Sequence, residues 1–297
     1  MGWSRHHKNG LIHHSIMRSY AGYTLTATRG GNYANLLDME GQVCHRWYCP
    51  EGIGYSYLLP NGNLLATTGA APEGQGMVGS SKSIVELDWD GNVVWEFRGP
   101  LLHHDFHRTE SGSTIALIWN KLDQTLADLV GGGFYEDGSN PEMFGDSVVE
   151  ISSTGKIMNT WNAWEHLDPA TDVICPLENR KEWTHANSLS LTPDGNFLIS
   201  FRQTSTIGIV DRETGDFTWK WGPGDISHQH HLISLQLVLH LSDPVLHLLP
   251  SILSAMTPCY PVSYTHLRAH EPEAARVCRL LLEKKRGGGG GGGGGGG

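Results

Sequence analysis

One pattern occurs four times along the chain and restricts its fold more than any other feature. In each copy an apolar strand leads through a glycine-containing turn into a second strand that carries a tryptophan, namely Trp47, Trp95, Trp161 and Trp219. A further hairpin follows each of the first three copies, with turns at residues 60–63, 111–112 and 193–196. Two hairpins in each repeat of roughly 50 to 65 residues predict the four-stranded blades of a β-propeller, with long loops in some blades.

The pattern divides the chain into three parts. Residues 1–20 are an N-terminal extension, residues 21–231 form the predicted propeller, and residues 232–297 lack the pattern. Residues 21–231 supply about four blades, which is few for a closed propeller, so we expect an all-β chain that is cut short. The longest interruption, residues 121–145, contains three consecutive glycines and is predicted to be a lid or a rim insertion.

The tail differs in character from the rest of the sequence. Residues 232–253 are apolar and have no Asp-Gly turns, which indicates a shifted reading frame or a chimeric join near His231. A genuine apolar helix interrupted by proline is the alternative. Residues 263–286 resemble a translated sequencing adaptor, and residues 287–297 are an unbroken run of glycine. We therefore exclude the tail from fold reasoning and expect the residues beyond about 232 to pack poorly or not at all on the propeller.

Charge and composition exclude some classes of partner. The formal net charge is -10, and no basic cluster precedes residue 279, which argues against binding to nucleic acid. The first 20 residues contain no apolar core of a signal peptide, and residues 21–231 contain no apolar run long enough for a membrane span. We expect no membrane partner and a cytoplasmic location by default; a missing true start is the alternative.

Histidines recur where the second hairpin of a repeat begins. They lie in residues 102–106 (LHHDF), 183–187 (WTHAN) and 227–230 (SHQH). In a propeller this position is the start of the innermost strand, so the pattern predicts that three blades direct imidazoles to one axial pocket. Arg202 ends an apolar strand, and its guanidinium beside these imidazoles is suited to an oxyanion. Hydrogen-bonded structural histidines, or a site for zinc or another metal ion, are the alternatives.

A longer string carries a resemblance to a known family. Residues 183–222 read WTHANSLSLTPDGNFLISFRQTSTIGIVDRETGDFTWKWG, with HHDF upstream and HQH downstream. This combination resembles the arylsulfate sulfotransferases over roughly residues 20–231. The resemblance implies a six-bladed propeller that transfers a sulfuryl group from an aryl sulfate to a phenol through a sulfated histidine. It implies ping-pong kinetics and neither a nucleotide sulfate donor nor a cofactor, and it suggests export to the periplasm in related proteins.

The resemblance also assigns roles to single residues. His185 and Asn187 match the family's His-x-Asn, Arg202 matches its sulfate-binding arginine, and His104 matches its earlier channel histidine. The best match to the nucleophile is His230, with His228 as the other candidate.

Three functional readings therefore remain open at the level of sequence. Besides the sulfotransferase, they are a non-catalytic propeller that binds ligands or proteins, and a metal-dependent hydrolase on the same scaffold. The literal G-x-G-x-x-G of residues 74–79 does not favour nucleotide binding, because no strand leads into it and no helix follows it.

Overall fold

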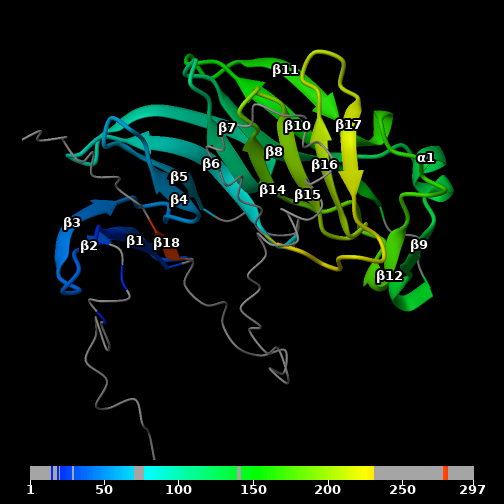
Figure 1. Ribbon diagram of the computed structural model, residues 1–297, viewed down its shortest axis with the longest axis horizontal. Helices are drawn as coiled ribbons and strands as arrows, with labels where there is room; N and C mark the ends of the chain where they lie inside the picture. Colours follow the sequence, from blue (N-terminus) through cyan, green and yellow to red (C-terminus); the bar gives the residue numbers. More distant parts are fainter. Residues whose placement is uncertain are drawn as a thin grey trace, which may run out of the picture.

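The computed structural model describes residues 15, 19, 21–28, 30–69, 77–138, 142–230 and 277–279 (Figure 1). The described chain is almost entirely β, and its antiparallel sheets follow one another in sequence order as propeller blades. This confirms the predicted all-β architecture of four-stranded blades. The described blades do not close into a ring, and the part of the chain described here has no helix long and apolar enough to cross a membrane.

The first blade is built from the N-terminal repeat. Its strands are β1 (Thr24–Ala27), β2 (Tyr33–Leu37) and β3 (Val43–Tyr48), paired antiparallel in this order. A fourth strand, β18 (Val277–Arg279), pairs with β1 through Leu25 and Cys278. This short strand belongs to the adaptor-like tail, for which we expect poor packing or none, and it pairs with β1 along three residues. Residues 231–276 and 280–297, where the rest of that expectation falls, lie outside the described residues.

The second and third blades share one continuous strand. The second blade contains β4 (Ser56–Leu58), β5 (Leu64–Thr68), β6 (Ser80–Leu87) and the first part of β7 (Val93–Arg108). The third blade contains the second part of β7, then β8 (Thr114–Lys121), β10 (Phe144–Ile151) and β11 (Ile157–Asn162). Phe97 pairs with Ile84 of β6, and Phe106 pairs with Ala116 of β8, whereas His103 between them pairs with both strands. Strand β7 is therefore the outer strand of one blade and the inner strand of the next.

The fourth blade follows the predicted hairpins of residues 183–222. It consists of β14 (Ala186–Leu191), β15 (Phe197–Phe201), β16 (Thr206–Val210) and β17 (Phe217–Trp221) in sequential antiparallel order. All five residues of β15 are buried, as expected for a central strand covered on both faces.

A separate apolar cluster joins each pair of neighbouring blades. Successive residues of a strand contribute to different clusters because strand side chains alternate between the two faces. Leu64 packs toward the first blade and Leu65 toward the third. Val148 likewise packs toward the fourth blade and Val149 toward the second. The apolar runs in the sequence therefore supply both faces of each blade.

The repeated tryptophans also join neighbouring blades. Trp47 Nε1 of the first blade donates to Asp88 O, 3.0 Å away, in the β6–β7 turn of the second blade. Trp161 Nε1 of the third blade donates to Gly215 O, 2.9 Å away, in the β16–β17 turn of the fourth. These two indoles each satisfy a carbonyl of the following blade. Trp95 differs, because its Nε1 is buried without a hydrogen-bond partner and its ring instead lies 4.5 Å from the Arg108 guanidinium.

Two ion pairs repeat the same arrangement. Arg108 Nη2 of the third blade lies 2.7 Å from Glu86 Oε2 of the second, and Arg212 Nη2 of the fourth lies 2.7 Å from Glu150 Oε2 of the third. The two glutamates, which occupy equivalent repeat positions, thus hold the turns of adjacent blades.

Two insertions form a packed rim beside the third and fourth blades. The first, predicted as a lid or rim segment, contains α1 (Gln124–Leu129), β9 (Gly132–Phe134) and the 3-10 turn η3 (Glu136–Gly138). The second contains η4 (Ala163–Glu165), β12 (Ile174–Asn179) and β13 (Glu182–Trp183). β9 pairs with β12 and β13 pairs with β10, so the rim is anchored to the propeller.

Candidate functional site

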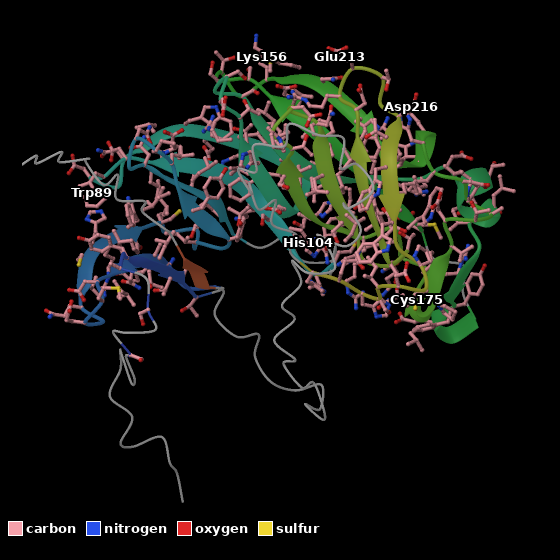
Figure 2. All side chains as sticks on the ribbon, viewed as in Figure 1. Trp89, His104, Lys156, Cys175, Glu213 and Asp216 are labelled. Carbon is pink, nitrogen blue, oxygen red and sulfur yellow. The ribbon has the colours of Figure 1, made fainter. Side chains whose placement is uncertain are left out.

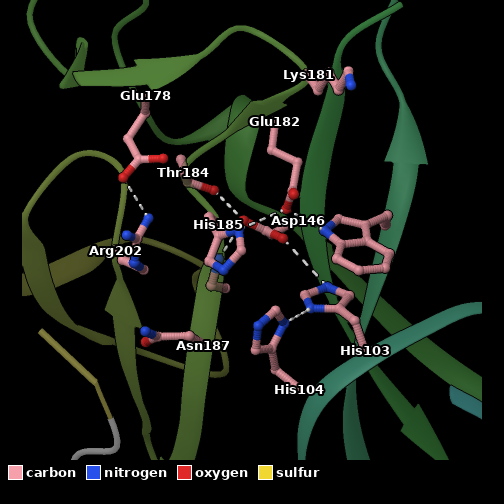
Figure 3. Close-up of polar contacts among 12 residues, drawn as sticks. His103, His104, Asp146, Glu178, Lys181, Glu182, Thr184, His185, Asn187 and Arg202 are labelled. Atoms are coloured by element: carbon pink, nitrogen blue, oxygen red, sulfur yellow. Dashed lines mark hydrogen bonds and ion pairs between the residues drawn. The ribbon is translucent and has the colours of Figure 1, made fainter. Parts of the chain in front are cut away.

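The inner strands of the third and fourth blades bring four predicted site residues together. His104 comes from β7, His185 precedes β14, Asn187 lies in β14, and Arg202 directly follows β15 (Figure 3). In Figure 2, His104 lies at the opposite end of the blades from Lys156 and Glu213, which are in outer turns. The rings of His104 and His185 lie together, with centroids 4.6 Å apart. The third predicted group, His228 and His230, follows β17 and does not begin an inner strand.

His104 belongs to a buried row of polar side chains that begins at Asp146. Asp146 Oδ2 accepts hydrogen bonds from Thr184 Oγ1 and, at 2.7 Å, from Ala186 N. Its other oxygen lies 3.3 Å from His103 Nε2, and His103 Nδ1 lies 3.0 Å from His104 Nδ1. All three side chains of this row are buried.

His185 has its own buried carboxylate. Its Nδ1 lies 2.9 Å from Glu182 Oε2, which also accepts a hydrogen bond of 2.9 Å from Trp119 Nε1. Burial acts to lower the pKa of His185, but the hydrogen bond and charge of Glu182 and the charge of Asp146 outweigh it, so the pKa is raised. His185 is consequently protonated over a wider pH range than an ordinary histidine.

Arg202 connects the fourth blade to the segment that follows β17. Its Nη1 lies 2.7 Å from Glu178 Oε1, and its Nε donates to His230 Nε2 at 3.1 Å. His228 Nε2 lies 3.4 Å from the same Glu178 oxygen. Both candidate nucleophiles thus lie close to the arginine, and the ring of His230 is the more exposed of the two.

Asn187 fixes the position of this last segment. Its Nδ2 donates to Gln229 O at 2.8 Å, while the Gln229 amide nitrogen donates to Phe201 O and Thr206 O at 3.1 and 2.9 Å. Residues 228–230 are therefore held against the inner end of the fourth blade.

The backbone of the site has an unusual conformation. The described non-glycine residues with positive φ are Leu101, His104, Thr184, His185, Ser205 and His228. Three are candidate site histidines, and Thr184 bonds to Asp146. Such conformations cost about 1–3 kcal/mol each and concentrate at functional sites, where the surrounding structure maintains them.

Sequence reasoning missed the carboxylates that hold these side chains. Glu178 and Glu182 come from the rim insertion, which does not follow the repeat, and Asp146 is a single acidic residue at the start of an apolar strand. No local motif marks them; a signal is visible only as acidic residues close to the WTHAN string. The metal alternative has no support in the described ranges, where no group of three or more His, Cys, Asp or Glu side chains is arranged to hold an ion.

Together these features define a class: a β-propeller protein with a histidine- and arginine-containing site at the inner ends of its blades. The model of the arylsulfotransferase (ASST) family matches residues 13–241. The chain belongs to this family, which confirms the resemblance seen in the sequence. No curated protein matches the chain significantly.

Solved structures resemble the chain only distantly. It is 13% identical to a protein of unknown function from Bacteroides caccae, covering 70% of this chain and 64% of that one, with a TM-score of 0.39. It is 12% identical to the WD40 β-propeller domain of Doa1, covering 69% of this chain and 52% of that one, with a TM-score of 0.40. It is 16% identical to hydrazine synthase of Kuenenia stuttgartiensis, covering 64% of this chain and 49% of that one, with a TM-score of 0.41. The chain spans about half to two thirds of these proteins, and likenesses at this level carry no functional argument.

Proposed function

We propose that this protein transfers a sulfuryl group from an aryl sulfate to a phenol through a sulfated histidine, without a nucleotide donor. Membership of the arylsulfotransferase family supports this reaction class. The observation that carries the finer proposal is the contact between Arg202 Nε and His230 Nε2, because it joins an anion-binding group to a nucleophile.

Arg202, Asn187 and His185 are the proposed donors to the sulfuryl oxygens. Sulfuryl transfer resembles phosphoryl transfer in spreading charge over peripheral oxygens, so fixed cations and N–H groups stabilise the transition state. The guanidinium is always charged, and the pKa of His185 is raised by Glu182 and Asp146 against the opposing effect of burial. When His185 is protonated, its charge adds to that of the guanidinium.

His230 is the proposed nucleophile. Since arginine can only donate, the Nε2 atom that faces Arg202 Nε must carry a lone pair. The Nε2 atom of His228 instead lies 3.4 Å from a Glu178 carboxylate oxygen, an ion-pair contact without hydrogen-bond geometry. This difference favours His230 over His228. A bound sulfate competes for the Arg202 guanidinium and releases the His230 lone pair toward sulfur.

The two half-reactions balance as follows. In the first, His230 Nε2 forms a bond to sulfur, the bond between sulfur and the aryl oxygen breaks, and the departing phenolate receives a proton. In the second, an acceptor phenol loses its proton, its oxygen attacks sulfur, and the nitrogen–sulfur bond breaks. His104 is the proposed proton carrier. His185, whose pKa is raised, is better suited to bind the sulfuryl oxygens.

The test is intact-mass spectrometry after brief mixing of the full chain with 4-nitrophenyl sulfate. We expect one acid-labile SO3 group, lost when phenol is added, and peptide mapping should locate it on His230. The variant His230→Ala should neither gain mass nor turn over, whereas His228→Ala should still gain mass. A folded protein that releases no nitrophenolate and gains no mass would refute the proposed reaction, and a label on His228 would refute the assignment of the nucleophile.

A further inference from the structure

The row Asp146, His103 and His104 determines where the protons lie. Asp146 Oδ2 accepts hydrogen bonds from Thr184 Oγ1 and Ala186 N. The other oxygen, Oδ1, lies 3.3 Å from His103 Nε2, an ion-pair contact without hydrogen-bond geometry. A lone pair on Nε2 would be repelled by the carboxylate, so the proton of neutral His103 belongs on Nε2.

The same reasoning extends to the next ring. A neutral His103 with its proton on Nε2 has a lone pair on Nδ1. His104 Nδ1 lies 3.0 Å from this atom, so it must be the donor of the pair. The proton of neutral His104 is then on Nδ1, and Nε2 is the nitrogen without a proton. In Figure 3 this second nitrogen faces the side where Asn187 and Arg202 lie.

Trp119 gives the row its rigidity. The His103 ring stacks on the indole with centroids 4.0 Å apart and planes inclined by 10°. The indole Nε1 donates to Glu182, the carboxylate that holds His185. One buried side chain, 1% exposed, therefore orients both histidines of the site.

We propose that Asp146 and His103 are positioning residues that fix His104 as the Nδ1-protonated tautomer, so that His104 takes up and releases protons through Nε2. The arrangement follows the logic of a hydrolase triad, in which a buried acid sets the tautomer of the histidine that transfers the proton. Here a second imidazole is inserted between the acid and the working ring.

The catalytic part of this inference rests on the proposed function. In the first half-reaction the leaving phenolate takes the Nε2 proton of protonated His104, which leaves the neutral ring with its proton on Nδ1. In the second, the attacking phenol gives its proton to Nε2 and restores the protonated ring. The dependence on this exchange differs between donors: phenolate is a strong base that requires protonation, whereas 4-nitrophenolate is a weak base that leaves without it.

The first test is independent of activity. The full chain is labelled with ¹⁵N-histidine, and the shifts of the His104 ring nitrogens are identified by comparison with His104→Gln. In spectra recorded at a pH where the His104 ring is neutral, we expect a protonated Nδ1 and an unprotonated Nε2. In His103→Phe, which can still stack on Trp119, the proton should move to Nε2. In His103→Asn, whose side-chain oxygen can accept the His104 Nδ1 proton, the original tautomer should return. His107→Phe, a matched change on the same strand, should leave the His104 shifts unaltered. A wild-type spectrum with the proton on Nε2 would overturn the proposal, whether or not any variant folds.

The second test uses two donors. His103→Phe should slow turnover of phenyl sulfate by about a hundredfold more than turnover of 4-nitrophenyl sulfate, and His103→Asn should recover part of the loss. An equal loss with both donors would mean that His103 acts only through structure and would remove its positioning role. If the wild-type protein transfers no sulfuryl group, the proposed function fails, while the spectrum still decides the tautomer.

Discussion

The contact between Gly79 and His104 permits a sharp test of how closely the site is packed. Gly79 lies at φ +94°, and its carbonyl accepts a hydrogen bond of 2.9 Å from His104 N. A Cβ atom at this position would lie 2.4 Å from His104 Cε1 and 2.6 Å from Nε2. The variant Gly79→Ala therefore combines a strained backbone with a collision against the imidazole.

The two effects have different magnitudes and different readouts. A left-handed backbone costs an alanine about 1–2 kcal/mol, which for a domain of this size lowers Tm by roughly 2–6 °C. Relief of the collision requires the ring to move by about 1 Å, since carbon contacts prefer about 3.5–4.0 Å. A displacement of this size costs about a hundredfold in rate at a catalytic group.

Gly62 is a matched control for the backbone term. It lies at φ +87° in the turn between β4 and β5, and a Cβ atom there would have no neighbour within 4 Å. Both variants should lower Tm, measured by thermal unfolding, and Gly79→Ala at least as much as Gly62→Ala, but only Gly79→Ala should lose sulfuryl transfer. Equal activity of the two variants would refute the argument that His104 needs the space beside Gly79.

Three further changes address other contacts. Arg202→Lys keeps the positive charge but loses the Nε donor that faces His230, so kcat for sulfuryl transfer should fall by about tenfold or more while Tm changes little. Glu182→Gln should lower the pKa of His185, measured by NMR titration, because burial then prevails. A histidine whose pKa is raised in the folded state stabilises the fold at pH values below its unfolded-state pKa. This stability is lost as the pH rises through the folded-state pKa. The wild type should therefore exceed Glu182→Gln in stability by more at acidic pH. Trp161→Phe removes the bond to Gly215 and should lower the free energy of unfolding by about 1 kcal/mol, measured by urea titration; no change would show that the indole does not join the blades.

The propeller was predictable because its signals are local. Trp47 and Trp161 recur with glycine turns, and each strand alternates between two apolar faces within a few residues. The merging of two blades through β7 was not predictable. Residues 98–102 contain glycine and proline and read as a loop, but pairing with β6 and β8 on either side keeps the strand continuous.

The site was predictable only in part. His104, His185 and Arg202 could be located because they stand at repeat positions, where topology brings the inner strands together. Glu182 could not be assigned, because its contact with His185 depends on how the rim insertion folds back on β10. The contact of His103 with His104 was also invisible, since adjacent strand residues normally face opposite ways and only the positive φ of His104 brings the two rings together.

The shared strand β7 has a consequence for how the protein opens. Its 16 residues give the second and third blades a common backbone, so neither blade can detach without breaking hydrogen bonds in the other. These two blades should exchange their amide hydrogens as one cooperative unit, whereas the fourth blade, connected through loops, can open separately. His103 and His104 belong to the unit that opens slowly, whereas Arg202 belongs to the fourth blade, which opens faster. Local unfolding of the fourth blade therefore exposes the anion-binding arginine before the proton-carrying His104 ring is disturbed.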